Sequence, residues 1–259
     1  MPLPLWEKIL LVWAIMHIIG PLALRFTFRY SARVEPAKVD PGALPVAVRA
    51  MINRWSSQIQ SAGFSLVGIY DMGELASDTR SFLAYFVNRS AGDFADISVV
   101  TKDTKTQGYF EFSSSFTNGL TLDTNANKTI SVTSTPSDIL IFRFPQITSP
   151  SQLYQVHRAL IQKHAGFLHP QLPPVGEESS RIVKQVGRFG PCQAEAGYMR
   201  LASDGTHYRL TWKGACLVAW KSLWPTSLIR RSLYRARMQK VLNSLQSSGI
   251  VAISTASNF

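Results

Sequence analysis

The first apolar stretch of the chain runs from Ile9 to Leu24 and contains 16 residues without a charged side chain. A helix of that length rises roughly 24 Å, slightly less than a hydrocarbon core of roughly 30 Å. The flanking Lys8 and Arg25 can make up the difference, because long cationic side chains snorkel toward the headgroups. We therefore expect a membrane anchor over residues 1–34.

Two other interpretations of this stretch remain open. A secretory signal peptide would begin with basic residues and end at small ones, whereas here Glu7 precedes the run and arginines follow it. A core or re-entrant helix is the second alternative, since His17, Gly20 and Pro21 interrupt the run.

Basic residues are more frequent after the run than before it. Only Lys8 and the α-amine precede it, whereas Arg25, Arg29, Arg33 and Lys38 follow it. Because positive residues mark the cytoplasmic side of a membrane helix, we expect a bacterial inner-membrane protein whose C-terminal domain is cytoplasmic.

A short linker and a helix come next. Residues 35–45 contain three prolines and a glycine, which predicts a stiff linker. An apolar stripe then recurs at helical spacing and predicts a helix that begins near Pro45 and ends at Gly63. The stripe consists of Val48, Met51, Ile52, Trp55, Ile59 and Ala62.

Between residues 64 and 144 the pattern changes to short β-rich runs. Asn118–Gly119 lies between two of them and predicts a tight hairpin turn. Several runs are apolar on both faces, which indicates a sheet packed against helices. The expected strands are Phe64–Tyr70, Ser81–Asn88, Asp96–Thr101, Gly108–Thr117, Leu120–Asp123, Thr129–Thr133 and Asp138–Phe144.

A second helix is predicted after this sheet. Ser149 and Gln152 have the spacing of a capping box, with a proline at the first helical position, and Gly166 marks the end. The buried face would be Leu153, Val156, Leu160 and Ile161. Helix, antiparallel sheet and helix together predict an α+β domain over residues 46–167.

Residues 168–259 are expected to form a hairpin plus a basic amphipathic helical region. A proline-rich boundary comes first, then a helix near Glu177–Val186. Ala196–Leu201 and His207–Thr211 form the hairpin through Asp204–Gly205. Two helices follow, separated at Pro225.

Both final helices show apolar stripes. In the first, we expect the stripe to be Trp212, Cys216, Ala219, Trp220 and Leu223, with Lys213 and Lys221 facing away. The second is expected from Thr226 to about Gln246, with a stripe of Tyr234, Met238, Val241, Leu242 and Leu245.

Charge distinguishes this last segment from the rest of the chain. The net charge is +11 overall, and residues 177–259 hold twelve basic and four acidic residues. Helices with Trp or Leu on one side and Lys or Arg on the other are attracted to membrane interfaces. We expect docking to the lipid bilayer or to a protein partner through Lys213, Trp220, Lys221, Trp224, Arg230, Arg231, Arg235, Arg237 and Lys240. An ordinary solvated helix face and nucleic-acid contact are the alternatives.

One short motif favours nucleic acid. His207–Gly214 reads HYRLTWKG and resembles the strand-to-helix corner after the wing of winged-helix regulators, which often reads Y-x-L-T-x-K-G. The resemblance covers eight of 259 residues. It implies that the hairpin acts as a wing and that Glu177–Val186 supplies the recognition helix.

Common catalytic and phosphate-binding patterns are absent from the sequence. No G-x-G-x-x-G, G-K-[ST], H-E-x-x-H or G-x-S-x-G occurs. Cys192 and Cys216 lie in separate segments without a zinc or reactive-thiol spacing. His157 and His164 are roughly 10 Å apart along a helix axis, too far to share a metal, so we interpret them and His169 as partly buried structural histidines.

Two acidic groupings are interpreted as loops. Asp123, Asn125 and Asn127 match the opening of a calcium loop, but Lys128 and Ser134 replace its glycine and its bidentate glutamate. An Asx-rich turn between strands is the expected structure. Asp71, Glu74 and Asp78 are likewise interpreted as a solvated loop rather than as paired catalytic carboxylates.

The sequence thus predicts a single-pass membrane-anchored binding, scaffold or accessory subunit with a cytoplasmic α+β domain, working in a membrane complex. No catalytic, cofactor or metal-binding residues are identified, so we lean against an enzyme. A membrane-linked nucleic-acid-binding regulator is the first alternative. An enzyme acting on lipid-linked substrates is the second, because a pocket built from scattered residues leaves no pattern.

Overall fold

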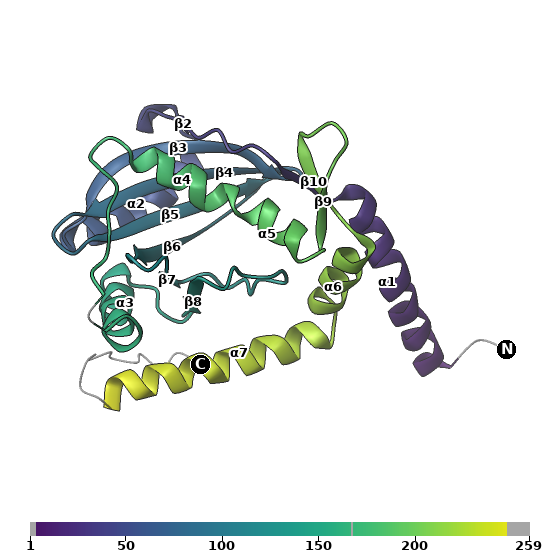
Figure 1. The fold of residues 1–259 in the computed structure, drawn as a ribbon. Coiled ribbons are helices and arrows are strands. Elements are labelled where there is room, and N and C mark those ends of the chain that lie inside the picture. The colour runs from purple at the N-terminus through teal and green to yellow at the C-terminus, as the bar shows by residue number, and fades with distance from the viewer. Residues whose placement is uncertain (1–3, 167, 248–259) are drawn as a thin grey trace.

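The computed structural model describes residues 4–166 and 168–247, and it consists of one large sheet with helices on both faces (Figure 1). The predicted α+β class is confirmed: an apolar N-terminal helix is followed by a mainly antiparallel sheet and then by C-terminal helices. The helices are α1 (Leu5–Thr27), α2 (Val46–Ser61), α3 (Pro150–His164), α4 (Glu178–Gly187), α5 (Phe189–Glu195), α6 (Trp212–Ser222) and α7 (Thr226–Ser247).

The strands follow the order β8-β7-β6-β5-β4-β3-β1-β10-β9, with β2 pairing β3 beside this path. All pairs are antiparallel except β7 with β8. The strands are β1 (Arg29–Ser31), β2 (Ala37–Lys38), β3 (Ser65–Ala76), β4 (Thr79–Asn88), β5 (Asp93–Lys102), β6 (Lys105–Ser115), β7 (Thr121–Asn125), β8 (Ile139–Arg143), β9 (Met199–Leu201) and β10 (His207–Leu210).

Most predicted strands are present, and the differences have physical reasons. The expected strand Thr129–Thr133 is irregular chain, and the connection that contains it carries the backbone back so that β8 lies parallel to β7. The segment around Asp71 and Glu74 is the end of β3 rather than a solvated loop, because the turn to β4 needs only Ser77 and Asp78. The Asn118–Gly119 turn is confirmed, with Gly119 at a φ of 84°.

One face of the sheet is covered by α2, α3 and the second half of α7. The predicted stripes of α2 and α3 are confirmed, since Val48, Ile59, Leu153 and Leu160 are all buried there. The predicted capping box at Ser149 is wrong, because its hydroxyl bonds to Gln58 and Ser151 instead of capping α3. Phenylalanines from β4 and β6 fill this core, namely Phe86, Phe110 and Phe112.

The other face is covered by α4, whose Ile182 packs with Tyr85 and Phe94. The expected helix Glu177–Val186 is therefore confirmed within one residue at each end, whereas the short α5 that follows was not expected. The β9–β10 hairpin is confirmed as well, and β1 joins it to β3, so residues 199–210 belong to the same sheet as residues 65–143.

Candidate membrane-facing surface

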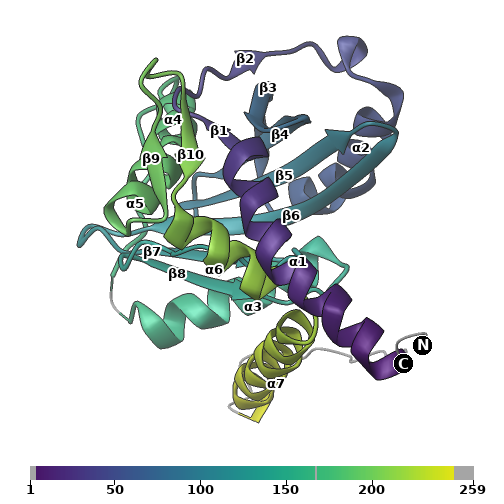
Figure 2. The same cartoon turned by 90° about the vertical axis from the view of Figure 1, so that its right-hand side faces the viewer.

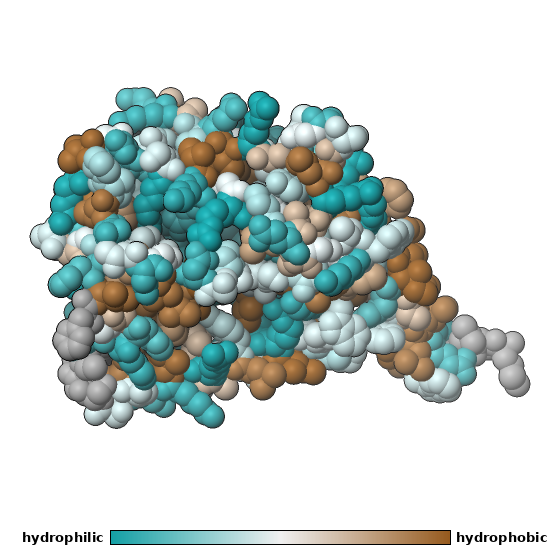
Figure 3. All heavy atoms as spheres, in the orientation of Figure 1, coloured by the Kyte–Doolittle hydropathy of each residue, from teal (hydrophilic) through white to brown (hydrophobic). Residues whose placement is uncertain are grey.

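The N-terminal helix α1 is long and apolar enough to span a membrane. It has 23 residues, and its 18-residue window reaches a mean hydropathy of 2.0. Pro21 is its only buried residue, so the helix lies along the flank of the domain rather than inside the core (Figure 1). Figure 3 shows hydrophobic side chains gathered over α1 at the right of the molecule.

One side of α1 packs against α6, and the two helices run in opposite directions (Figure 2). Arg25 lies 5.9 Å from the centre of the Trp212 ring, whereas His17, two turns earlier, lies 5.8 Å from the ring of Trp220. Gly20 lies between these two contacts, and a Cβ there would be 3.9 Å from that of Ala219, an ordinary van der Waals distance. The C-terminal half of α1 is thus one partner of a helix pair.

The two tryptophans of the predicted α6 stripe lie on the outer side of the helix, next to α1. Trp212 and Trp220 are 55% and 52% exposed, and Cys216 between them is exposed as well. The buried positions are Gly214, Ala215 and Ala219, of which only Ala219 belongs to the predicted stripe. Small residues occupy the inner side because the backbone of α6 runs against the domain, where a Cβ on Gly214 would collide with the Tyr198 carbonyl.

Both lysines of α6 bond to the domain, although Lys213 stays exposed. Lys213 Nζ donates to the Ala196 carbonyl oxygen at 3.0 Å and lies over the Tyr198 ring, and Lys221 Nζ donates to the Val132 carbonyl oxygen at 3.0 Å. What is unusual for a helix in water is the outward position of the tryptophans, which normally face inside. Of the residues expected to dock, these two lysines are therefore occupied by contacts within the domain.

Helix α7 continues the apolar surface over its first turns. Trp224, just before it, is 63% exposed, and Leu228, Ile229 and Leu233 are exposed too. Ile229, Leu233 and Lys240 follow helical spacing, so they share one outward face. The second half of the helix carries the predicted stripe, which is confirmed: Met238, Leu242 and Leu245 are buried against the sheet domain.

The arginines expected to dock divide into two groups. Arg230 donates to the carbonyl oxygens of Lys221 and Ser131, at 3.1 and 2.8 Å, and so fastens the start of α7. Arg231, Arg235, Arg237 and Lys240 are exposed. This exposed group and the outward-facing Trp220 and Trp224 are the expected docking residues that remain available to an external surface.

The strand-to-helix corner at His207–Gly214, which resembles a winged helix, has the expected local structure. Its position in the fold differs from that of a wing. Thr211 caps α6 by accepting a hydrogen bond from the Gly214 amide at 3.0 Å. However, β10 is an interior strand of the large sheet, paired with both β1 and β9. The proposed recognition helix α4 lies across that sheet with Ile182 buried, so neither element stands free as in a wing and a reading helix.

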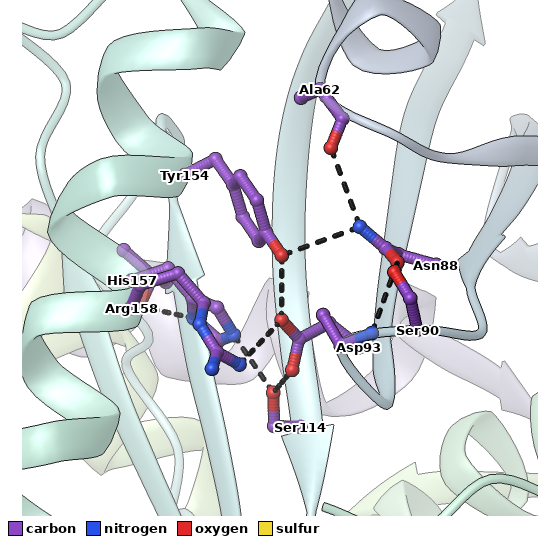
Figure 4. A network of polar contacts seen from close by, with 10 residues as sticks. Ala62, Asn88, Ser90, Asp93, Ser114, Tyr154, His157 and Arg158 are labelled. Atoms are coloured by element: carbon purple, nitrogen blue, oxygen red, sulfur yellow. Dashed lines mark hydrogen bonds and ion pairs between the residues drawn. The ribbon is translucent and has the colours of Figure 1, made fainter.

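A buried polar network links α3 to the sheet (Figure 4). Asp93 accepts hydrogen bonds from Ser114 Oγ at 2.6 Å, from the Tyr154 hydroxyl at 2.9 Å and from Arg158 Nη1 at 2.9 Å. Ser114 Oγ also lies 2.9 Å from His157 Nε2, and Thr124 Oγ1 lies 3.0 Å from the other ring nitrogen. Because Ser114 gives its proton to Asp93, Nε2 carries the ring proton of a neutral His157.

These residue types are those of a hydrolase triad, but their contacts differ from one. In a triad the carboxylate orients the Nδ1 of the histidine, and the serine faces the substrate. Here a threonine contacts Nδ1, and Asp93, Ser114 and His157 all have 0% exposure. Burial lowers the pKa of His157 to about 3, so the ring is a poor base at neutral pH. The network therefore fixes α3 on the sheet rather than activating Ser114.

A row of carboxyl groups lies on the opposite face of the sheet. Asp96 faces Glu111 on the neighbouring strand, and Asp123 is close enough to raise the pKa of both. Burial is the largest cause, and it raises the pKa of Asp96 to about 7. Arg181 of α4 covers this face and donates to Tyr85, Ser113 and Ser115.

The sequence analysis named His157 and Asp123 but did not predict either polar group. The signal for the acidic row was the alternation of polar residues along β5 and β6, such as Asp96 with Ser98 and Glu111 with Ser113. Among the described residues, no group of three or more His, Cys, Asp or Glu side chains is placed to hold a metal ion.

The remaining candidate residues are only partly where we expected them. His157 is a buried structural histidine, as predicted, whereas His164 and His169 are exposed. Asp123 and Asn125 lie within β7, and the Asx turns begin only at Asn125 and Asn127, whose side chains accept the amides two residues on. Cys192 is partly buried and unpaired.

Comparison with known proteins adds nothing to these contacts. No protein-family model, curated protein or solved structure matches the chain.

Proposed function

We propose that this chain is a membrane-attached binding or accessory subunit. Helix α1 is its anchor, α6 and the start of α7 lie against the bilayer, and the sheet domain faces the cytoplasm, where it contacts a protein partner. The observation that carries the proposal is the outward position of the two α6 tryptophans beside α1, while the lysines of the same helix bond to the domain.

Burial energetics explain why this polarity favours a lipid environment. Exposing a tryptophan to water forfeits the favourable transfer of its large apolar surface, and two of them lie on one face of α6. The indole ring also suits the level of the headgroups, since its N–H can bond there while the ring stays in apolar surroundings. A membrane beside α1 would satisfy both tryptophans without any change in the domain.

The charges near this surface support the same placement. Arg25, Arg29, Arg33 and Lys38 follow α1 along the chain, which favours the cytoplasmic side for the domain.

Extraction of membranes tests the anchor. The full chain is expressed with a C-terminal tag, and the membrane fraction is washed with alkaline carbonate, which releases peripheral proteins. We expect the wild type to stay with the membranes. The triple variant Leu11→Asp, Ile15→Asp, Ile18→Asp should move to the soluble fraction, because buried charges are costly in hydrocarbon.

These three positions are exposed on α1, so the substitutions leave the packing of the domain intact. A matched variant with Leu11→Ala, Ile15→Ala and Ile18→Ala controls for the number of changes and should remain in the membrane fraction. Release of the wild type by carbonate would contradict the proposal.

A further inference from the structure

An apolar groove separates the N-terminal half of α1 from the turn between α6 and α7. Its volume is about 320 Å³, within the range of small-molecule pockets. It is lined by Lys8, Ile9, Val12, Trp13, Met16 and His17 of α1, and by Leu223 and Trp224. From Lys8 to Met16 the helix rises roughly 12 Å, so the groove is long enough for a substantial part of an acyl chain.

The groove has an apolar floor and a single available cation. His17 turns back to its own helix, where its Nδ1 lies 2.8 Å from the Trp13 carbonyl oxygen, and its ring meets Trp220 edge-on. Lys8 is exposed at the N-terminal end of the groove, and its ammonium has no hydrogen-bond or ion-pair partner among residues 4–166 and 168–247. An occupant with an apolar tail and an anionic head would complement both features.

We propose that this groove binds one anionic phospholipid, with an acyl chain along Val12 and Met16 and its phosphate at Lys8. The inference rests on the proposed function, because α1 must lie in a membrane for lipid to reach the groove. Within hydrocarbon, water does not fill an apolar groove of this size, and an empty one forfeits dispersion contacts along both walls. Lipid chains are the molecules that surround α1 in that setting.

Retention of lipid by the full-length protein tests the site. The chain is purified from membranes in mild detergent, washed extensively and supplied with phosphatidylglycerol, and bound phospholipid is counted by native mass spectrometry. We expect one retained phosphatidylglycerol per wild-type chain. Val12→Trp fills the groove and should lower the retained fraction about tenfold, the effect of losing about 1.4 kcal/mol.

Ile18→Trp is the matched control, because Ile18 is 71% exposed and does not line the groove, being about 120° around α1 from Val12. It introduces the same side chain without entering the groove, so retention should equal that of the wild type. Equal losses in both variants, or no retention by the wild type, would overturn the site.

A second variant does not depend on repacking. Lys8→Ala should keep the acyl contacts but lower the preference for phosphatidylglycerol over phosphatidylcholine about fivefold, the ratio given by about 1 kcal/mol per cation. An unchanged preference would contradict the placement of the phosphate. Carbonate extraction of the same variants separates the two proposals: if the wild type resists extraction yet retains no lipid, only the groove is wrong.

Discussion

In the sheet domain, the polar side chains of Asp93, Ser114 and His157 lie inside the protein and bond to one another. On the α1–α6 edge, the lysines bond to the domain and the tryptophans lie outside. In both regions these polar side chains have hydrogen-bond partners, but only the sheet domain buries its apolar surface. The comparison teaches that the two regions are adapted to different surroundings: the domain is stable around its own core, and the edge needs an apolar environment that the chain does not supply.

The largest expected effect is on the free energy of unfolding, where a buried apolar residue of the sheet domain should matter far more than an exposed one on α7. Phe86→Ala removes a ring with 0% exposure and should lower the free energy of unfolding by about 3–5 kcal/mol. Leu233→Ala should change it by less than about 0.5 kcal/mol, because Leu233 is exposed on α7. Urea unfolding of the full chain in mild detergent, followed by circular dichroism, measures both. A comparable loss in the two variants would mean that Leu233 packs within the protein.

The next prediction concerns how the stability of the sheet domain depends on pH. Because the folded-state pKa of His157 is about 3 and its unfolded-state pKa is about 6.5, stability from its neutral form is complete above pH 6.5 and is lost as pH falls toward 3. At pH 4.5 the loss should be about 2–3 kcal/mol. His157→Gln cannot titrate, so the stability difference between wild type and variant should shrink by that amount between pH 7.5 and 4.5.

The raised pKa of Asp96 acts in the opposite direction, since protonation there favours the folded state as pH falls. This effect is common to both proteins and cancels in their difference. A difference that stays constant over this pH range would show that His157 does not titrate as its burial requires.

The smallest expected effect is the difference in unfolding free energy between substitutions of two cations, one on α6 and one on α7. Lys221→Ala removes the bond to the Val132 carbonyl oxygen and should cost about 1 kcal/mol of unfolding free energy. Arg235→Ala should cost less than about 0.5 kcal/mol, because Arg235 is exposed on α7. The same unfolding measurements apply. If Arg235 proved the more important of the two, the division between bound and available cations would be wrong.

The sequence allowed the elements to be predicted more reliably than their surroundings. Periodicity located α2, α3 and α7, because a helix that packs on a sheet must bury one stripe. For α6 the same rule identified a stripe without deciding what the stripe faces, and Trp212 and Trp220 lie outward. Periodicity reports which residues share a face, not which solvent that face meets.

Local sequence patterns could not predict the tertiary contacts. The parallel pairing of β7 with β8 and the joining of β10 to β3 through β1 depend on segments far apart in the chain. The network around Asp93 likewise combines residues from β5, β6, β7 and α3. Only the alternation of polar residues within single strands was available in the sequence.

The most direct measurement of the central proposal uses Cys216, which lies exposed between Trp212 and Trp220 on the outward side of α6. In a Cys192→Ser background, inverted inner-membrane vesicles are treated with a charged, membrane-impermeant maleimide. The control carries Cys192→Ser, Cys216→Ser and Thr117→Cys, which places the thiol in the exposed β6–β7 turn at the end of the sheet away from α1.

Because a charged reagent does not enter hydrocarbon, Cys216 should react at least about tenfold more slowly than the control thiol and should match it once detergent dissolves the membrane. Equal rates in intact vesicles would place the tryptophan face of α6 in water and contradict the proposal.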